Sequence, residues 1–272
     1  MHRDPRGGHN RKQINENFFK YWSPQMSYVL GLIFADGAIE DVRKSSRTCY
    51  LAITSKDKSL LEKIKKSLSS SHKLYIRKPR IVTFSHGESY LCSKTFTLRI
   101  GNKTMFSDLV NLGLTPRKSL TISLPEIPEQ YFGHFLRGYF DGDGCVTTGI
   151  PKGRKTAEIQ TIFISGSRKF LESLSLKLKD LLFIKTKNIF SKDNSHYLRY
   201  RGKESLRILH FMYKNLVNTP YLERKYKIYY TFLRNLSSQG EYSRLPHLSQ
   251  NKAIISSWPK KKLSKRQFSS FY

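Results

Sequence analysis

Two Asp-Gly pairs end apolar runs at corresponding places in the sequence. Asp36 and Gly37 end the run YVLGLIFADG, and Asp143 and Gly144 end the run FLRGYFDGDG, at an offset of 107 residues. Each run predicts a buried helix. The C-terminus of a helix carries partial negative charge, so a carboxylate there is disfavoured unless a cation meets it. The two aspartates therefore predict a cation site.

The helices that must position these aspartates carry small residues four positions apart. These are Gly31 and Ala35 in the first run, and Gly138 and Gly142 in the second. Residues four apart share a helix face, and small side chains let two helix backbones approach closely. Packing through these faces would bring Asp36 and Asp143 together, each followed by a glycine suited to a left-handed helix end. Either motif alone is equally consistent with a structural turn, whereas the matched pair favours a site for a hard divalent cation such as Mg²⁺.

The composition points to a polyanionic partner. The 272 residues include 49 Lys and Arg against 20 Asp and Glu, a net charge of +29, and 38% are apolar. Basic residues are spread along the whole chain, which favours nucleic acid as the partner and leaves enough apolar residues for a core. The cysteines form no CxxC pair, which fits a reducing compartment. The longest apolar stretch is about half of a membrane span, so we expect no membrane association.

The chain repeats one design. Leu98-Arg99 returns as Leu198-Arg199, and Arg117-Lys118 returns as Arg224-Lys225. Each half reads as helix, strands, helix, strands, helix, which predicts an α+β fold built from two related units. We divide the chain into a basic N-terminal extension, a first half, a second half and a flexible basic C-terminal tail. These are residues 1–22, 23–122, 123–236 and 237–272.

Several segments of the sequence resemble those of a known family. VLGLIFADG (29–37) and LRGYFDGDG (136–144) resemble the two signature motifs of the LAGLIDADG homing endonucleases. LGLTPRKSLTISLPEIP followed by GHFLRGYFDGDGCV resembles the segment that joins the halves in two-motif members, and YLERKYKIYY resembles their closing helix. The resemblance covers most of the chain between the two extensions.

The resemblance implies a fold and a metal site. It implies pseudo-symmetric αββαββα halves, antiparallel sheets that form a DNA-binding saddle, and motif helices packed at the centre. The eighth motif residue is the metal-binding acid, here Asp36 and Asp143, with backbone near Ala35 and Gly142 as further ligands. Mg²⁺ is the expected cofactor, Mn²⁺ a substitute, and Ca²⁺ is expected to support binding without cleavage. Asp141 is expected to be a capping or peripheral residue.

Other catalytic residues follow from the same resemblance. Lys118 and Lys225 match lysines of the family's active sites, where an ammonium group can polarise water or offset developing charge. Ser55 and Ser165 lie at strand ends where the family often places a polar residue that orients water. Neighbouring Thr54 and Gly166 are alternatives for that position.

The polar faces of the strands are the expected DNA-reading surface. In TFTLRI (95–100), apolar and polar side chains alternate, which predicts one buried face and one open, basic face. Arginine can read guanine edges in the major groove. The candidate DNA-binding residues are Arg77, Thr97, Arg99, Tyr197, Arg199 and Arg201.

The resulting prediction is a site-specific, Mg²⁺-dependent endonuclease, intron-encoded, that makes a staggered double-strand break as a monomer. Two alternatives stay open: an RNA-binding maturase that binds its own intron RNA, and a DNA-binding regulator with an inactive site. We expect an intracellular protein of a bacterial cytoplasm or an organelle, either a mitochondrion or a chloroplast.

Overall fold

The computed structural model describes residues 12–43, 48–83, 87–154 and 156–238. Both halves, as far as Tyr229, lie in one compact unit. A second unit begins at Tyr230, and its described part is the end of the last helix. The predicted C-terminal tail lies outside the described residues from position 239 onward.

The first half begins with a central helix and builds a four-stranded sheet. Its antiparallel strands have the order β1-β2-β6-β3, and β4 and β5 form a separate two-stranded ribbon. In chain order the elements are α1 (Pro24–Asp36), β1 (Gly37–Asp41), β2 (Cys49–Ser55), α3 (Lys58–Ser67), β3 (Leu74–Arg77), β4 (Arg80–Thr83), β5 (Ser89–Cys92), β6 (Thr95–Gly101), α4 (Lys103–Asn111) and η1 (Lys118–Leu120).

The second half repeats this plan. Its sheet has the order β7-β8-β10-β9, which is equivalent to that of the first sheet. The elements are α5 (Glu129–Asp143), β7 (Gly144–Gly149), β8 (Glu158–Ser165), α6 (Arg168–Leu182), β9 (Ile189–Lys192), β10 (Ser195–Arg201), α7 (Gly202–Tyr213) and α8 (Glu223–Ser238). The predicted α+β fold of two related αββαββα halves is confirmed.

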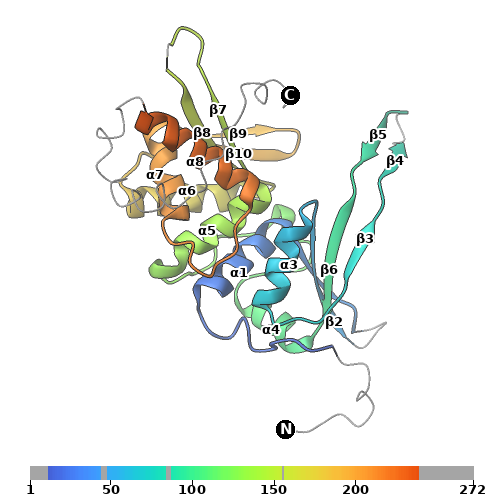
Figure 1. Cartoon of the computed structure of the whole chain (residues 1–272). Coiled ribbons are helices and arrows are strands. Elements are labelled where there is room, and N and C mark those ends of the chain that lie inside the picture. The colour runs from blue at the N-terminus through green and yellow to red at the C-terminus, as the bar shows by residue number, and fades with distance from the viewer. Residues whose placement is uncertain (1–11, 44–47, 84–86, 155, 239–272) are drawn as a thin grey trace. The chain divides into compact units, whose positions relative to one another are not determined.

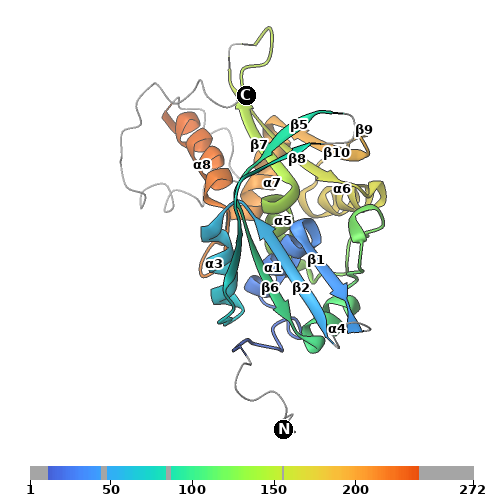
Figure 2. The same cartoon turned by 90° about the vertical axis from the view of Figure 1, so that its right-hand side faces the viewer.

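Helices α1 and α5 pack along each other at the centre of this unit (Figures 1 and 2). Helix α1 starts where the Ser23 hydroxyl accepts a hydrogen bond from the Met26 amide, with Pro24 in the first turn, a position that suits its fixed backbone angle. Met26–Phe34 are all buried. A helix that is apolar all round belongs in a core, so the motif helix is fixed by burial on every side.

Each sheet has one covered face and one open face. Along β6, Phe96, Leu98 and Ile100 are buried while Arg99 between them is exposed. Helices α3 and α4 pack on the first sheet, and α6 and α7 pack on the second. The alternation predicted from the sequence therefore holds, and it leaves a polar face on both sheets.

The segment ahead of α1 differs from the extension that we expected. Phe18 and Phe19 are buried, and backbone hydrogen bonds join Asn15 to Leu68 and Ser71 to Gln13. Residues 12–22 therefore pack on the first half, because two adjacent phenylalanines supply apolar surface that an extension would leave in water.

The hairpins of the two sheets differ in length. In the second half, β9 and β10 are joined by Asp193 and Asn194, both in the left-handed region, as a tight two-residue turn requires. In the first half the equivalent hairpin continues beyond β3 and β6 into β4 and β5, and we call the described residues 78–83 and 87–94 the arm. It projects beyond β3 and β6 in Figure 1. No described helix has the length and apolar character of a membrane span.

Candidate active site at the ends of the central helices

Glycines let α1 and α5 touch through their backbones. A Cβ atom on Gly31 would collide with the carbonyl oxygen of Phe135, and one on Gly138 would collide with that of Tyr28. A Cβ atom on Gly142 would collide with the Cβ atom of Ala35. The spacing of small residues found in the sequence thus fixes how the two helices are aligned, because any side chain at these glycines would force them apart.

This alignment brings the two aspartates to one place. Asp36 and Asp143 are the last residues of α1 and α5, and the Asp36 carboxylate lies only 3.2 Å from where a Cβ atom of Gly142 would be. The Asp36 side chain is open to solvent and Asp143 is half-buried. Desolvation by the surrounding protein and, to a smaller extent, the negative charge of Asp143 raise the pKa of Asp36 to about 6. Burial also raises the pKa of Asp143. Burial therefore disfavours ionisation of both carboxylates, and the charge of Asp143 adds to this effect at Asp36.

The prediction that the glycines after the two aspartates adopt a left-handed conformation is wrong. Gly37 has φ −87° and Gly144 has φ −102°, so both are extended and neither is left-handed. Steric space explains the residue type instead. A Cβ atom would lie 2.6 Å from the Ile33 Cα atom at Gly37, and 2.5 Å from the Phe140 carbonyl oxygen at Gly144. Glycine therefore lets the chain pass directly from helix to strand.

Lys118 meets the negative end of α1. Its buried ammonium group donates hydrogen bonds to the carbonyl oxygens of Phe34 at 2.8 Å and Ala35 at 2.9 Å. Burial lowers the pKa of Lys118, while the charges of Asp143 and Asp36 oppose that shift. The side chain satisfies carbonyl groups that lack partners within the helix.

Lys225 does the same for α5, with one more partner. Its buried ammonium group donates to the carbonyl oxygens of Phe140, Asp141 and Gly144. Burial lowers the pKa of Lys225 to about 8. The two lysines predicted from the repeat therefore occupy equivalent places beside the two aspartates. They are also cations at helix ends, a structural role that the sequence reasoning missed.

Asp141 is neither a cap nor a peripheral residue, contrary to our expectation. Its side chain is buried, and one carboxylate oxygen accepts hydrogen bonds from the Tyr28 hydroxyl at 2.7 Å and from the Leu222 amide at 2.8 Å. Burial raises the pKa of Asp141. The partners lie on other elements, so no local pattern could have indicated them.

Ser55 and Ser165 lie at equivalent strand ends. The Ser55 hydroxyl accepts a hydrogen bond from the Asp57 amide, and the Ser165 hydroxyl accepts one from the Ser167 amide, both at 3.1 Å. The alternatives lie nearby: Thr54 is hydrogen-bonded to Thr97, and a Cβ atom on Gly166 would lie 2.5 Å from the Ser119 carbonyl oxygen. Gly166 therefore packs against the backbone of η1 at Ser119.

The residues expected to read DNA share the open faces of the sheets. Thr97 lies directly opposite Tyr75 and Thr54 on the neighbouring strands, and Arg201 lies opposite Gln160, so these side chains point to the same face of their sheet. The full predicted set, three residues on each sheet, is Arg77, Thr97, Arg99, Tyr197, Arg199 and Arg201.

Several of these side chains have protein partners. Arg99 lies 3.6 Å above the Tyr50 ring and pairs with Glu40 at 3.0 Å, so its guanidinium is held flat over the sheet. Arg201 donates to Gln160 at 3.0 Å. Tyr75 and Gln160 are on the same faces and were missed, although the alternation along their strands could have indicated them.

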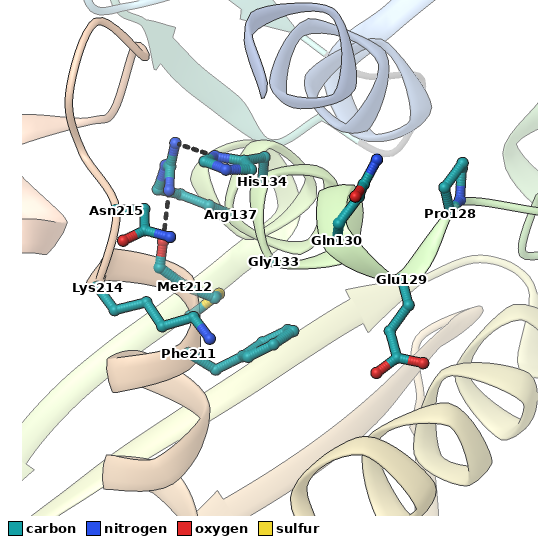
Figure 3. Close-up of a pocket in the computed structure, with 10 residues that line it drawn as sticks. All are labelled: Pro128, Glu129, Gln130, Gly133, His134, Arg137, Phe211, Met212, Lys214 and Asn215. Atoms are coloured by element: carbon teal, nitrogen blue, oxygen red, sulfur yellow. Dashed lines mark hydrogen bonds between the residues drawn. The ribbon is translucent and has the colours of Figure 1, made fainter. Parts of the chain in front are cut away.

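A pocket of about 640 Å³ lies at the opposite end of α5 (Figure 3). Glu129, His134, Arg137 and Lys214 are among its lining residues, and none of the predicted site residues is. Arg137 is buried and donates to the carbonyl oxygens of Met212 and Pro220, as well as to the His134 ring. Its hydrogen-bonding groups therefore serve the fold.

The donor set at the helix ends suits a hard cation. Within the described residues, no group of three or more His, Cys, Asp or Glu side chains is arranged to hold a metal ion. The acidic ligands at the helix ends are the carboxylates of Asp36 and Asp143. Mg²⁺ is commonly held by one or two carboxylates together with water and substrate phosphates. The residues present fit that ion.

Comparisons with known proteins agree with the fold of the two halves. Residues 133–211 match the family model of the LAGLIDADG-like domain. An uncharacterized protein of Methanocaldococcus jannaschii is 29% identical over 126 residues, which is 46% of this chain and 41% of that relative's length. The LAGLIDADG meganuclease I-CpaMI, solved bound to uncleaved DNA, superimposes with a TM-score of 0.51 at 13% identity, covering 88% of this chain and 100% of that one. For I-AabMI, also bound to uncleaved DNA, the TM-score is 0.50 at 16% identity, with the same coverage of both chains.

The fold is therefore that of the LAGLIDADG meganucleases, over most of the chain. Residues 133–211 match the model of the LAGLIDADG-like domain, and the first half repeats the architecture of the second half around the Asp36 motif. The predicted resemblance to a single-chain, two-motif member is confirmed.

Proposed function

We propose that this chain is a site-specific homing endonuclease that makes a staggered double-strand break in a long, asymmetric DNA target. The observation that carries the proposal is the meeting of Asp36 and Asp143 at the touching ends of α1 and α5. Two mutually repelling carboxylates are unfavourable for the fold alone and useful around a cation. The DNA-bound meganucleases of the same fold, and a net charge of +29, support DNA as the substrate.

In this proposal Asp36 and Asp143 hold Mg²⁺, with backbone near Ala35 and Gly142 and with phosphate oxygens from the DNA. The ion would neutralise charge at phosphorus and activate water. Lys118 and Lys225 place positive charge beside the two carboxylates, where it can offset the charge that develops on the scissile phosphate. The open sheet faces bind the DNA as a saddle, and Arg77, Arg199 and Arg201 are candidates for base contacts.

The test combines selection and substitution. A random duplex library incubated with the protein and Mg²⁺ should yield one cut sequence. Asp36→Asn or Asp143→Asn should lower its cleavage by about 100-fold or more, because an amide replaces a metal-binding carboxylate. Gel-shift binding in Ca²⁺ should be retained, since the sheet faces are unchanged. Near-normal cleavage by both variants would contradict the metal assignment.

A further inference from the structure

The two motif helices differ at two buried positions, which are polar in α5 and apolar in α1. In α5, Arg137 and Asp141 lie four residues apart and therefore on one face. The equivalent residues of α1, at the offset of 107, are Leu30 and Phe34, both buried and apolar. The second half thus has two buried polar groups where the first half has none.

These two side chains hold the segment between α7 and α8, residues 214–222. Arg137 donates to the Met212 carbonyl at the end of α7, to the Thr219 hydroxyl at 2.8 Å and to the Pro220 carbonyl at 3.3 Å. Asp141 accepts from the Leu222 amide at 2.8 Å. An irregular segment is thereby fixed at both ends by a single helix.

Helix α8 begins immediately after this segment and carries Lys225. The Leu222 carbonyl accepts hydrogen bonds from the amides of Lys225 and Tyr226, both at 3.1 Å, so Leu222 starts the helix. The place of Leu222 therefore sets the place of Lys225, whose ammonium group returns to the Asp141 carbonyl at 2.9 Å. Asp141 also accepts from Tyr28 of α1, which links this arrangement to the first motif helix.

We propose that Asp141 is a positioning residue for Lys225, and that cutting of one DNA strand depends on it while cutting of the other does not. The inference rests on the proposed endonuclease function. Lys118 reaches the end of α1 from η1 without an equivalent of Asp141, because Phe34 occupies that position. A misplacement of about 1 Å at a reacting centre can slow a step by about 100-fold, so the effect should be measurable.

The experiment measures nicking of each strand separately, on a duplex labelled on both strands and cut by the full-length protein in Mg²⁺. Lys118→Met and Lys225→Met first assign one lysine to each strand. Asp141→Leu, which removes both hydrogen bonds, should slow the Lys225 strand by about 10- to 100-fold and the other strand by less than about threefold. Asp141→Asn keeps an acceptor for Tyr28 and Leu222 and should restore most of that rate.

Two further variants guard against a trivial loss of folding. Leu222→Pro deletes the same hydrogen bond from its donor side, at a helix start where proline is tolerated, and should produce the same strand bias. Leu174 is a buried residue of α6 and lies far in the sequence from the ends of α1 and α5. Leu174→Ala removes apolar contacts and should lower thermal stability without strand bias.

Equal slowing of both strands by Asp141→Leu and Leu222→Pro would show a purely structural role and overturn the inference. An unchanged rate on the Lys225 strand would overturn it as well. If the unmodified protein cut no selected duplex, the proposed function would fail instead, so the two failures are distinguishable.

Discussion

Lys118 and Lys225 have two effects at one place. They cap the negative ends of the motif helices, and they set positive charge beside Asp36 and Asp143. The sequence predicted a cation near the two aspartates. The buried lysines donate hydrogen bonds to the helix carbonyl groups, and a divalent ion is proposed to bind the carboxylates. In the proposed mechanism, the same two lysines therefore contribute to stability and to chemistry.

At the residue scale, the raised pKa of Asp36 predicts how stability depends on pH. In the folded protein this pKa is about 6, whereas an unfolded aspartate has a pKa of about 4. Between these values the folded state binds more protons, so without divalent ions the free energy of unfolding should fall as pH rises from about 4 to 6. Chemical denaturation at several pH values would measure this.

Asp36→Asn is the matched control for that pH dependence. It should flatten the fall, because the amide does not titrate, and Mg²⁺ should reduce the fall in the unmodified protein. A slope that stays the same in Asp36→Asn would show that other groups cause it.

At the scale of elements, the contact between α1 and α5 predicts a sharp difference between two glycines. Gly138→Ala should destabilise the protein by about 3 kcal/mol or more, because its Cβ atom would collide with the Tyr28 carbonyl oxygen. Gly149→Ala is the matched control, since no atom lies within 4 Å of a Cβ atom there. Denaturant unfolding of both variants would test this, and equal stabilities would contradict the backbone contact.

The arm makes the two halves unequal. It continues the β3–β6 hairpin and carries Lys78, Arg80 and Lys94, and the cross-strand pair Ile81 and Leu91 is largely exposed. The six residues from position 78 to 83, which include β4, span about 20 Å when extended, or roughly six base pairs of DNA. We expect the arm to lengthen the protected DNA on the side of the first half.

A loop exchange tests the arm. Replacing residues 78–94 by Asp-Asn joins Arg77 to Thr95 with the turn that already closes β9–β10 at the equivalent place. The nuclease footprint should shorten by about six base pairs at one end only, with the cut position unchanged. A footprint that keeps its length would contradict a DNA-binding arm, and shortening at both ends would indicate a wider disturbance.

At the scale of the whole molecule, one chain supplies both motif helices and both sheets. Because the Gly31 and Gly138 contact is already made within the chain, a second copy is not needed to complete the site. We predict a 1:1 complex with target DNA, measured by light scattering at the concentration used for cleavage. A stable complex of two proteins with one duplex would contradict this.

The sequence alone determined the repeated architecture, the meeting of Asp36 with Asp143 and the open faces of the sheets. These features are written in local, periodic patterns: small residues every four positions in a helix, and alternate polar residues along a strand. The net charge of +29 likewise needs no structure to indicate a polyanionic partner.

Only the tertiary structure decided the partners of the buried polar groups. Asp141 and Phe34 hold the same motif position, yet Asp141 bonds to Tyr28 and Leu222, residues 113 and 81 positions away in the chain. Gly37 and Gly144 are extended, where the residue type alone suggested a left-handed turn, and atoms of Ile33 and Phe140 leave no room for a side chain there. A sequence pattern reports the surroundings that recur along one element, whereas a buried hydrogen bond depends on which distant element packs against it.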